Sequence, residues 1–200
     1  MAELVWYVAY GSNLSGARLQ EYLDHGPDPT PPRADRPLTI GHPLFFAEES
    51  LTWGGGRAYV DHVVAVRPVT RARAWLLTRA QWADLHAQES GADHHPGADP
   101  ASLADGEVRV VGAGRYDVLV GLGRHDDIPV VTFTGPARLD PASCTRPAAA
   151  YLRRIATGLR EAHDLTPLEA AAYLLGRPGV RDQWAPHDLH RALGATAGPR

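Results

Sequence analysis

The stretch LVWYVAYGSNLSG, residues 4–16, predicts a strand, a tight turn and a helix start in direct succession. The run Val5–Tyr10 is apolar and rich in β-branched and aromatic residues, which is typical of a buried strand. Gly-Ser-Asn at 11–13 supplies turn-forming residues, and a helical pattern follows at roughly 15–24. Because the N–H groups of such a turn and the positive end of a helix point to one place, this segment can bind a carboxylate or another small anion.

The remaining pattern predicts one α+β domain over residues 1–194, with a frayed tail at 195–200. Strands dominate the first two thirds and helices the end, with few strand–helix–strand alternations. We therefore expect a mainly antiparallel or mixed sheet, curled into a small barrel and flanked by helices. Further strand patterns lie at 37–46, 57–66, 71–78, 108–121 and 128–134, and helical ones follow Thr78 and cover roughly 148–163 and 167–175.

Composition excludes several classes of protein. A net charge of -3 with interspersed acidic and basic residues argues against a nucleic-acid partner. Cys144 is the single cysteine, which excludes a disulfide within the chain and favours a reducing compartment. The chain contains no lysine, so Schiff-base, P-loop and pyridoxal chemistry are excluded. The apolar run from Leu4 is too short to span a membrane, and no signal peptide is evident, so we expect a cytoplasmic protein.

Glu89 is the first candidate for chemistry. Thr78 and Gln81 form a capping-box pattern at the start of its helix, and Gly91 ends the helix. Glu89 follows Trp82 and Leu85 on one helical face, so it is predicted to point inward with them. Burial and the negative end of the helix dipole would both raise its pKa, as a general acid/base requires. The alternative is that Glu89 reaches solvent at a fraying helix end, because charged residues are rarely fully buried.

Other polar residues carry weaker signals. Ser12 is a candidate nucleophile, but the sequence has no G-x-S-x-G motif around it. Asp93, His94 and His95 are adjacent in a Gly/Pro-rich loop, a spacing that favours solvated side chains over a metal site. Tyr151, at the start of a predicted helix, is typical of packing at the edge of a core and could also reach a substrate.

Together these elements resemble the γ-glutamylcyclotransferase-like (AIG2-like) family. The resemblance rests on Tyr-Gly-Ser-Asn after the first strand, on LTWGGGRAYV at 51–60, on the helix of Glu89, and on AAAYLRRIATGLREAHDL at 148–165. It spans roughly residues 5–165. Members of the family are small mixed β-barrels flanked by helices, and they cyclise γ-glutamyl amines or peptides to 5-oxoproline with release of the free amine.

The resemblance assigns roles to six residues. Gly11, Ser12 and Asn13 would bind the glutamyl moiety through backbone N–H groups, Glu89 would be the catalytic acid/base, and Tyr10 and Tyr151 would line the pocket. No cofactor and no metal ion are implied, and the expected partner is a small γ-glutamyl substrate rather than a nucleic acid or a membrane.

Two departures keep other functions open. The strand before the Glu89 helix reads RARAWLL, where the family usually carries a glycine and a tyrosine, and the loop at 90–107 is long. A module of the same fold that binds a small molecule without turnover is the first alternative. The second is an amide hydrolase or acyl transferase that uses Ser12 with a distant histidine, such as His42 or His62, as base. The leaving amine and the oligomeric state stay open.

Overall fold

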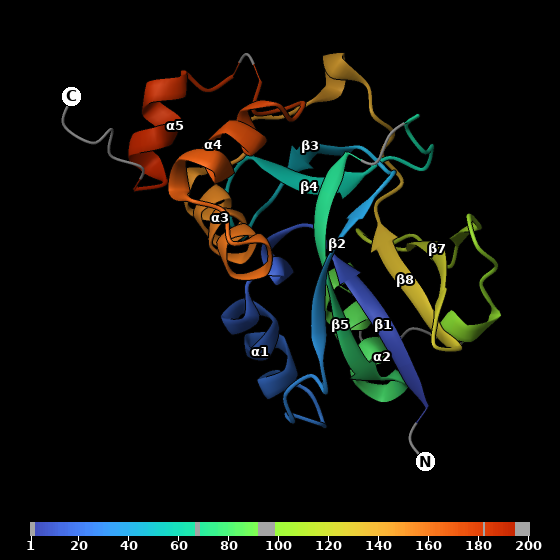
Figure 1. The fold of residues 1–200 in the computed structure, drawn as a ribbon. Helices are drawn as coiled ribbons and strands as arrows, with labels where there is room; N and C mark the ends of the chain where they lie inside the picture. The colour runs from blue at the N-terminus through green and yellow to red at the C-terminus, as the bar shows by residue number, and fades with distance from the viewer. Residues whose placement is uncertain (1–2, 67–68, 92–98, 182, 195–200) are drawn as a thin grey trace. The chain divides into compact units, whose positions relative to one another are not determined.

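The computed structural model of the chain describes residues 3–66, 69–91, 99–181 and 183–194 (Figure 1). The chain forms two compact units, and each unit consists of segments that are separated in the sequence. The first unit comprises Met1–Ala9, Ala17–Leu38 and Ala72–Pro136, and the second comprises Tyr10–Gly16, Thr39–Arg71 and Ala137–Arg200. A single domain over residues 1–194 stays a prediction, and the tail predicted at 195–200 lies outside the described residues.

A six-stranded mixed sheet dominates the first unit, apart from the ends of two strands that extend into segments of the second. Its central strand β1 (Leu4–Ala9) pairs antiparallel with β5 (Thr70–Thr78) and parallel with β8 (Ile128–Thr134). The predicted α+β class with a mixed sheet is therefore confirmed. The full strand order is β2-β5-β1-β8-β7-β6, where β2 is Asp35–Ile40, β6 is Val108–Val110 and β7 is Val118–His125.

The predicted closure into a barrel is not found among the described residues. The six-stranded sheet ends on one side at β2 and on the other at β6, and β3 and β4 form a separate two-stranded sheet. The two edge strands explain the open sheet. Five residues of β2 are exposed or half-buried, and β6 is only three residues long with Val108 and Val110 exposed. Neither strand offers the long apolar edge that closure would bury.

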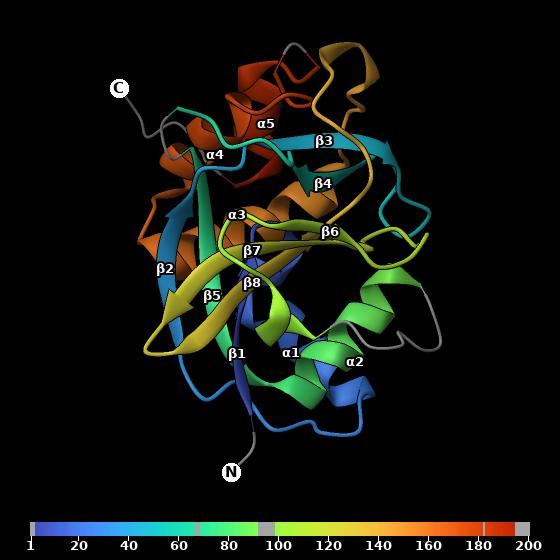
Figure 2. The ribbon, with the colours of Figure 1, turned by 90° about the vertical axis from the view of Figure 1, so that its right-hand side faces the viewer.

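The core of the first unit lies between the sheet and two helices. Helix α1 (Gly16–His25) contributes Leu19 and Leu23, and α2 (Arg79–Ser90) contributes Trp82 and Leu85. Figure 2 shows α1 and α2 side by side, and the Gln88 amide of α2 donates to a main-chain carbonyl of α1 at 3.0 Å. The strand residues of this core are Val5, Tyr7, Ala9, Trp75, Leu77, Leu119, Val131 and Phe133.

The second unit combines a β-hairpin with helices. Strands β3 (Leu44–Glu49) and β4 (Gly56–Val60) pair antiparallel, and the helices are α3 (Ala149–His163), α4 (Pro167–Leu175) and α5 (Pro186–Ala192). The predicted capping box at the start of α4 is present, with Thr166 and Glu169 bonded to each other's main chain. Short 3-10 helices occur at Ser12–Leu14, Pro100–Ser102 and Pro141–Ser143.

Strand and helix boundaries follow local signals closely, with three exceptions. The pattern at 37–46 divides into β2 and β3, because a bend at residues 41–42 interrupts it. The pattern at 108–121 divides into β6 and β7, because a turn with two glycines lies between them. The pattern at 57–66 ends as a strand at Val60, and Val63, Val64 and Val66 beyond it are exposed. None of the helices found in the described ranges is both long enough and apolar enough to cross a membrane.

Candidate functional site

The turn after β1 is a short 3-10 helix, Ser12–Leu14, that belongs to the second unit. The N–H of Leu14 donates to the carbonyl of Gly11, and that of Ser15 donates to the carbonyl of Ser12, each at 3.1 Å. Ser12 and Asn13 are buried, with 7% and 3% of their surface exposed. The predicted turn is therefore present, and its polar side chains point into the unit rather than to solvent.

Helix α3 packs directly against this turn at Gly158. A Cβ atom at Gly158 would lie 2.3 Å from the carbonyl carbon of Leu14 and 2.4 Å from the nitrogen of Ser15. Because real Cβ atoms do not approach backbone that closely, only glycine permits this contact. The sequence gives one signal of it, a glycine inside a helical pattern, which is usually unfavourable by about 1 kcal/mol and therefore suggests close packing.

A carboxylate of the chain itself already occupies the helix start that follows the turn. The N–H of Gly16, the first residue of α1, donates to Oε2 of Glu161 at 2.9 Å. The predicted anion site at the start of α1 therefore needs correction, since α3 supplies the anion there. Among the described residues, the backbone N–H groups of Gly11 and Ser12 donate to no other group.

Tyr151 lies beside the turn. Its hydroxyl oxygen accepts from the N–H of Ala58 at 3.3 Å and is 3.2 Å from the position that a Cβ of Gly11 would take. The Tyr151 ring lies 5.4 Å from the Trp53 ring and meets the Phe46 ring edge-on at 6.3 Å. The second unit thus brings Tyr151 and Gly11 together, and Tyr10 next to Gly11 is buried.

Glu89 lies in the last turn of α2, in the first unit. The predicted capping box of Thr78 and Gln81 is present, and Gly91 ends the helix in the left-handed conformation with φ 76°. Trp82 and Leu85 are buried, whereas Glu89 is half-buried. The helix therefore begins and ends as predicted, and its carboxylate residue lies at the boundary of the core rather than within it.

A cation of α1 lies within electrostatic reach of Glu89. Arg18 donates from Nη1 to Glu21 at 2.6 Å and from Nη2 to the Tyr22 hydroxyl at 2.8 Å. Burial lowers the pKa of Arg18, but the hydrogen bond to Glu21 and the negative charges nearby, Glu89 among them, raise it overall. The upward pKa shift expected for Glu89 stays a prediction.

The geometry around Ser12 does not resemble a nucleophile with its base. In the part of the chain that the structure describes, its hydroxyl makes no hydrogen bond with His42 or His62. His42 is buried, and its Nδ1 lies 2.7 Å from the carbonyl oxygen of Asp61. Its ring is thus oriented by the main chain and not by the serine.

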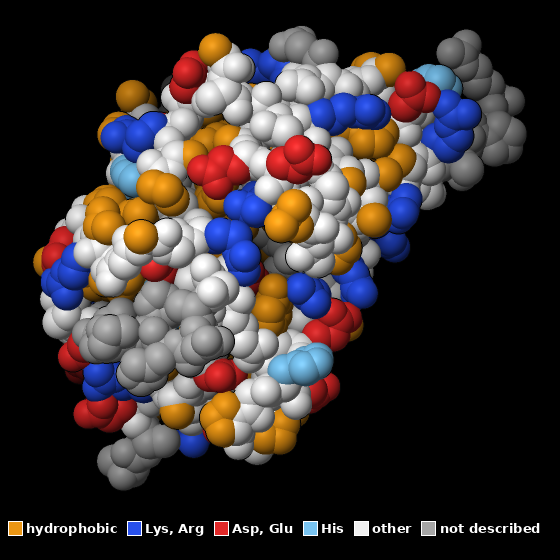
Figure 3. Space-filling model, turned by 180° about the vertical axis from the view of Figure 1, so that it is seen from behind, with side chains coloured by type: hydrophobic (Ala, Val, Ile, Leu, Met, Phe, Trp, Pro, Cys, Tyr) orange, Lys and Arg blue, Asp and Glu red, His pale blue; other side chains and the backbone are white. Residues whose placement is uncertain are grey.

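Metal ligands do not gather in the described ranges, where no three His, Cys, Asp or Glu side chains could hold an ion together. Asp93, His94 and His95 lie outside the described residues. On the face seen in Figure 3, basic and acidic side chains are interspersed, and no large patch of one sign is visible.

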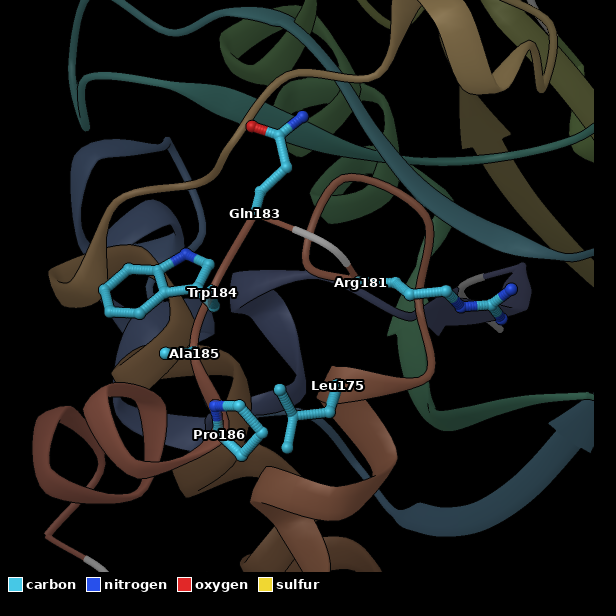
Figure 4. Close-up of a pocket in the computed structure, with 6 residues that line it drawn as sticks. All are labelled: Leu175, Arg181, Gln183, Trp184, Ala185 and Pro186. Carbon is cyan, nitrogen blue, oxygen red and sulfur yellow. The ribbon is translucent and has the colours of Figure 1, made fainter.

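A hollow of about 450 Å³ lies in the second unit (Figure 4). Its polar side chains are engaged with the main chain: Arg181 donates to Gly176 at 2.8 Å, Gln183 to Cys144 at 3.2 Å and Trp184 to Pro147 at 3.2 Å. No residue of the predicted site lines it, so we assign it no catalytic role. The residues that line it are Leu175, Arg181, Gln183, Trp184, Ala185 and Pro186.

Comparison with solved structures identifies the fold. The chain is similar to gamma-glutamyl cyclotransferase with a TM-score of 0.57 and 16% identity, over 97% of this chain and 100% of that one. It is also similar to an uncharacterized protein of Homo sapiens with a TM-score of 0.54 and 17% identity, over 96% of this chain and 99% of that one. The chain therefore has a gamma-glutamyl cyclotransferase-like fold, which confirms at the level of the fold the resemblance drawn from its motifs.

Comparison of sequences adds one relative. The chain is 30% identical over 203 residues to Histone deacetylase 5 of Arabidopsis thaliana. This match covers 85% of the chain but spans only 30% of that relative's length. No family model matches the chain.

Proposed function

We propose that the chain is a γ-glutamylcyclotransferase-type enzyme that cyclises a γ-glutamyl amine or peptide to 5-oxoproline and releases the free amine. The observation that carries this proposal is the fold shared with gamma-glutamyl cyclotransferase over almost the whole chain. The turn at Ser12–Leu14 and the position of Glu89 at the end of α2 support it further.

In the proposed reaction, the substrate supplies its own nucleophile. The α-amine attacks the γ-carbonyl carbon, a carbon–nitrogen bond forms to close a five-membered ring, and the bond to the leaving amine breaks. Since both reacting groups belong to one molecule, the enzyme has to hold the glutamyl chain in a folded conformation. Such positioning can contribute roughly 7–11 kcal/mol to the lowering of the barrier.

The residues of the chain divide this work. The backbone N–H groups of Gly11, Ser12 and Asn13 bind the α-carboxylate, and Tyr10 and Tyr151 line the pocket. Glu89 takes a proton from the α-ammonium group, which frees the amine to attack, and the attacking nitrogen sheds a second proton as the lactam forms. Both protons pass to the leaving nitrogen, which departs as an ammonium ion, so that no net proton is gained or lost. No covalent intermediate is needed.

Substrate panels and two variants test this proposal. The purified chain is offered several γ-glutamyl dipeptides and γ-glutamyl amines, and 5-oxoproline and free glutamate are quantified. Glu89→Gln should lower 5-oxoproline release by roughly 10²–10⁴-fold, because it keeps the shape of the side chain and removes its proton transfer. Ser12→Ala should retain most of the activity, because the Ser12 hydroxyl has no hydrogen-bonded base among the described residues.

Each alternative has its own result. Free glutamate as the product, lost in Ser12→Ala, would contradict the proposal and indicate a hydrolase. Binding of γ-glutamyl compounds without turnover across the panel would indicate a binding module of the same fold.

A further inference from the structure

The last turn of α2 is held by one residue from a distant segment. The final carbonyls of a helix have no partner within the helix and need one from elsewhere. Arg115 supplies two: its backbone N–H donates to the carbonyl of Ser90 at 3.2 Å, and its Nε donates to the carbonyl of Glu89 at 3.3 Å. A single arginine therefore binds the main chain of Glu89 and of the residue that follows it.

The guanidinium group of Arg115 also lies against the end of the helix. A Cβ at Gly91 would be 2.7 Å from Nη2 of Arg115, and Gly91 has a positive φ that favours glycine. A cation at this position interacts favourably with the negative end of the helix dipole. Contact, charge and hydrogen bonds thus all join Arg115 to the turn that carries Glu89.

Asp117 holds the segment from which Arg115 extends. Its side chain is buried, and its Oδ2 accepts from the N–H of Gly114 at 2.6 Å. A Cβ at Gly112 would lie 2.2 Å from the same oxygen, so the segment folds closely around the carboxylate. The position of Arg115 is therefore set by Asp117.

His86 attaches the same segment to α2 one turn before Glu89. It is fully buried, and its Nε2 donates to the carbonyl of Tyr116 at 2.9 Å, because a carbonyl oxygen can only accept. The same nitrogen lies 3.7 Å from Oδ1 of Asp117. The imidazole stacks on Trp82, with ring centroids 5.4 Å apart and an interplanar angle of 21°.

We propose that Arg115 and Asp117 are positioning residues that fix the last turn of α2 and so place the carboxylate of Glu89 for proton transfer. This inference rests on the function proposed above. Residues 115–117 contact α2 at two places. One is the His86 side chain, three residues before Glu89, and the other is the pair of carbonyls of Glu89 and Ser90.

The decisive variant is Arg115→Ala, measured in two ways. The kcat for 5-oxoproline release should fall roughly 10–100-fold while KM stays within about twofold, because a small misplacement of a catalytic group slows chemistry without weakening binding. Hydrogen exchange of the amides at residues 87–91 should become faster, because the turn loses the side-chain hydrogen bond to the Glu89 carbonyl and the cation beside it, while the backbone N–H at position 115 still donates to Ser90. Arg115→Lys should recover part of both, since a lysine can also bond a terminal carbonyl.

A matched control and a conservative variant separate positioning from general stability. Arg109 lies in the same unit and bonds Ser102 through its guanidinium, so Arg109→Ala removes similar contacts away from α2 and should leave kcat unchanged. Asp117→Asn keeps an acceptor for Gly114 and should lose less kcat than Asp117→Ala.

Unchanged kcat or unchanged exchange in Arg115→Ala would overturn the proposal. So would an equal loss of kcat in Arg109→Ala. If the wild-type chain releases no 5-oxoproline, the proposed function fails on its own. In that case, faster hydrogen exchange in Arg115→Ala still supports the inference that Arg115 fixes the last turn of α2, and unchanged exchange overturns that inference.

Discussion

The two turns proposed to act on the substrate are held in different ways within their own units. The turn Ser12–Leu14 is buried and is fixed by main-chain contact with α3, at a distance that only Gly158 allows. The last turn of α2, which carries Glu89, is half-buried and is fixed by hydrogen bonds from Arg115. One turn therefore depends on shape and the other on polar contacts.

This difference suggests a division of labour. A group that binds a small anion through backbone N–H groups needs a rigid main chain, and close packing provides it. A group that moves protons needs a side chain that can change its charge, which a half-buried helix end permits. Damage to the first turn should therefore cost folding stability as well as activity, whereas damage to the second should cost mainly rate.

The largest effect on stability is expected from Gly158→Ala. The added Cβ would meet the backbone of Leu14 and Ser15, which cannot move aside as a flexible side chain could. The variant should lower the free energy of unfolding by about 1–3 kcal/mol, even though alanine favours a helix over glycine by about 1 kcal/mol. Denaturant unfolding measures this change, and 5-oxoproline release should fall with it.

Gly176→Ala is the matched control for this prediction. Gly176 follows α4 in an ordinary helical conformation, and a Cβ there would meet its nearest neighbour at 3.4 Å, which is normal contact. Its substitution should change stability by less than about 0.5 kcal/mol. Equal stability of Gly158→Ala and the wild type would contradict the steric account of the turn.

Local chemistry explains why much of the fold could be predicted from the sequence. Helix ends depend on a few neighbouring residues, so Thr78, Gln81 and Gly91 were sufficient to place α2. The same is true of the Gly-Ser-Asn turn and of α4, whose bounds match the predicted ones. Helix periodicity places Glu89 on the same face as Trp82 and Leu85, but it does not predict that Glu89 is partly exposed.

Contacts between distant segments explain what could not be predicted. Arg115 caps α2 from 26 positions beyond Glu89, and no local pattern marks such a pair. The approach of Tyr151 to Gly11 depends on how α3 packs, for which the sequence carries only the glycine at 158. The open sheet likewise depends on pairing order, since a strand pattern does not state its neighbours.

The hydrogen bond between Tyr59 and Glu48 in the second unit extends the comparison of the two units, because it is lost when the Tyr59 hydroxyl is deprotonated at high pH. The Tyr59 hydroxyl donates to Glu48 at 2.7 Å, on the strand whose Ala58 bonds Tyr151. Burial, together with the charge of Glu48 and against that of Arg57, raises the pKa of Tyr59 to about 12. A raised folded-state pKa means that the stabilisation is complete below the unfolded value near 10 and is lost as pH rises toward 12.

Unfolding free energies measured from pH 8 to pH 12 test this point. The wild type should lose about 1–2 kcal/mol more between pH 10 and pH 12 than Tyr59→Phe, which has no phenol to ionise. Tyr173 adds to the loss in both proteins, since burial also raises its pKa. If the unfolding free energies of the two proteins depend on pH in the same way, the protonated Tyr59 hydroxyl does not stabilise this strand.

The smallest effect, and the one that best separates binding from packing, is expected from Tyr151→Phe. The substitution removes the hydrogen bond with Ala58 at 3.3 Å and should lower stability by about 0.5–1 kcal/mol. Tyr173→Phe removes a similar bond, in which the hydroxyl accepts from the N–H of Arg71 at 3.0 Å, and should cost about the same.

Activity should then distinguish the two tyrosines. If Tyr151 lines the pocket beside Gly11, Tyr151→Phe should raise the KM for γ-glutamyl substrates a few-fold, roughly 1 kcal/mol, with little change in kcat. Tyr173→Phe should leave KM unchanged at a similar loss of stability. Equal KM values in both variants would mean that Tyr151 only packs against the turn, and the shape-dependent turn would then bind its ligand through main-chain groups alone.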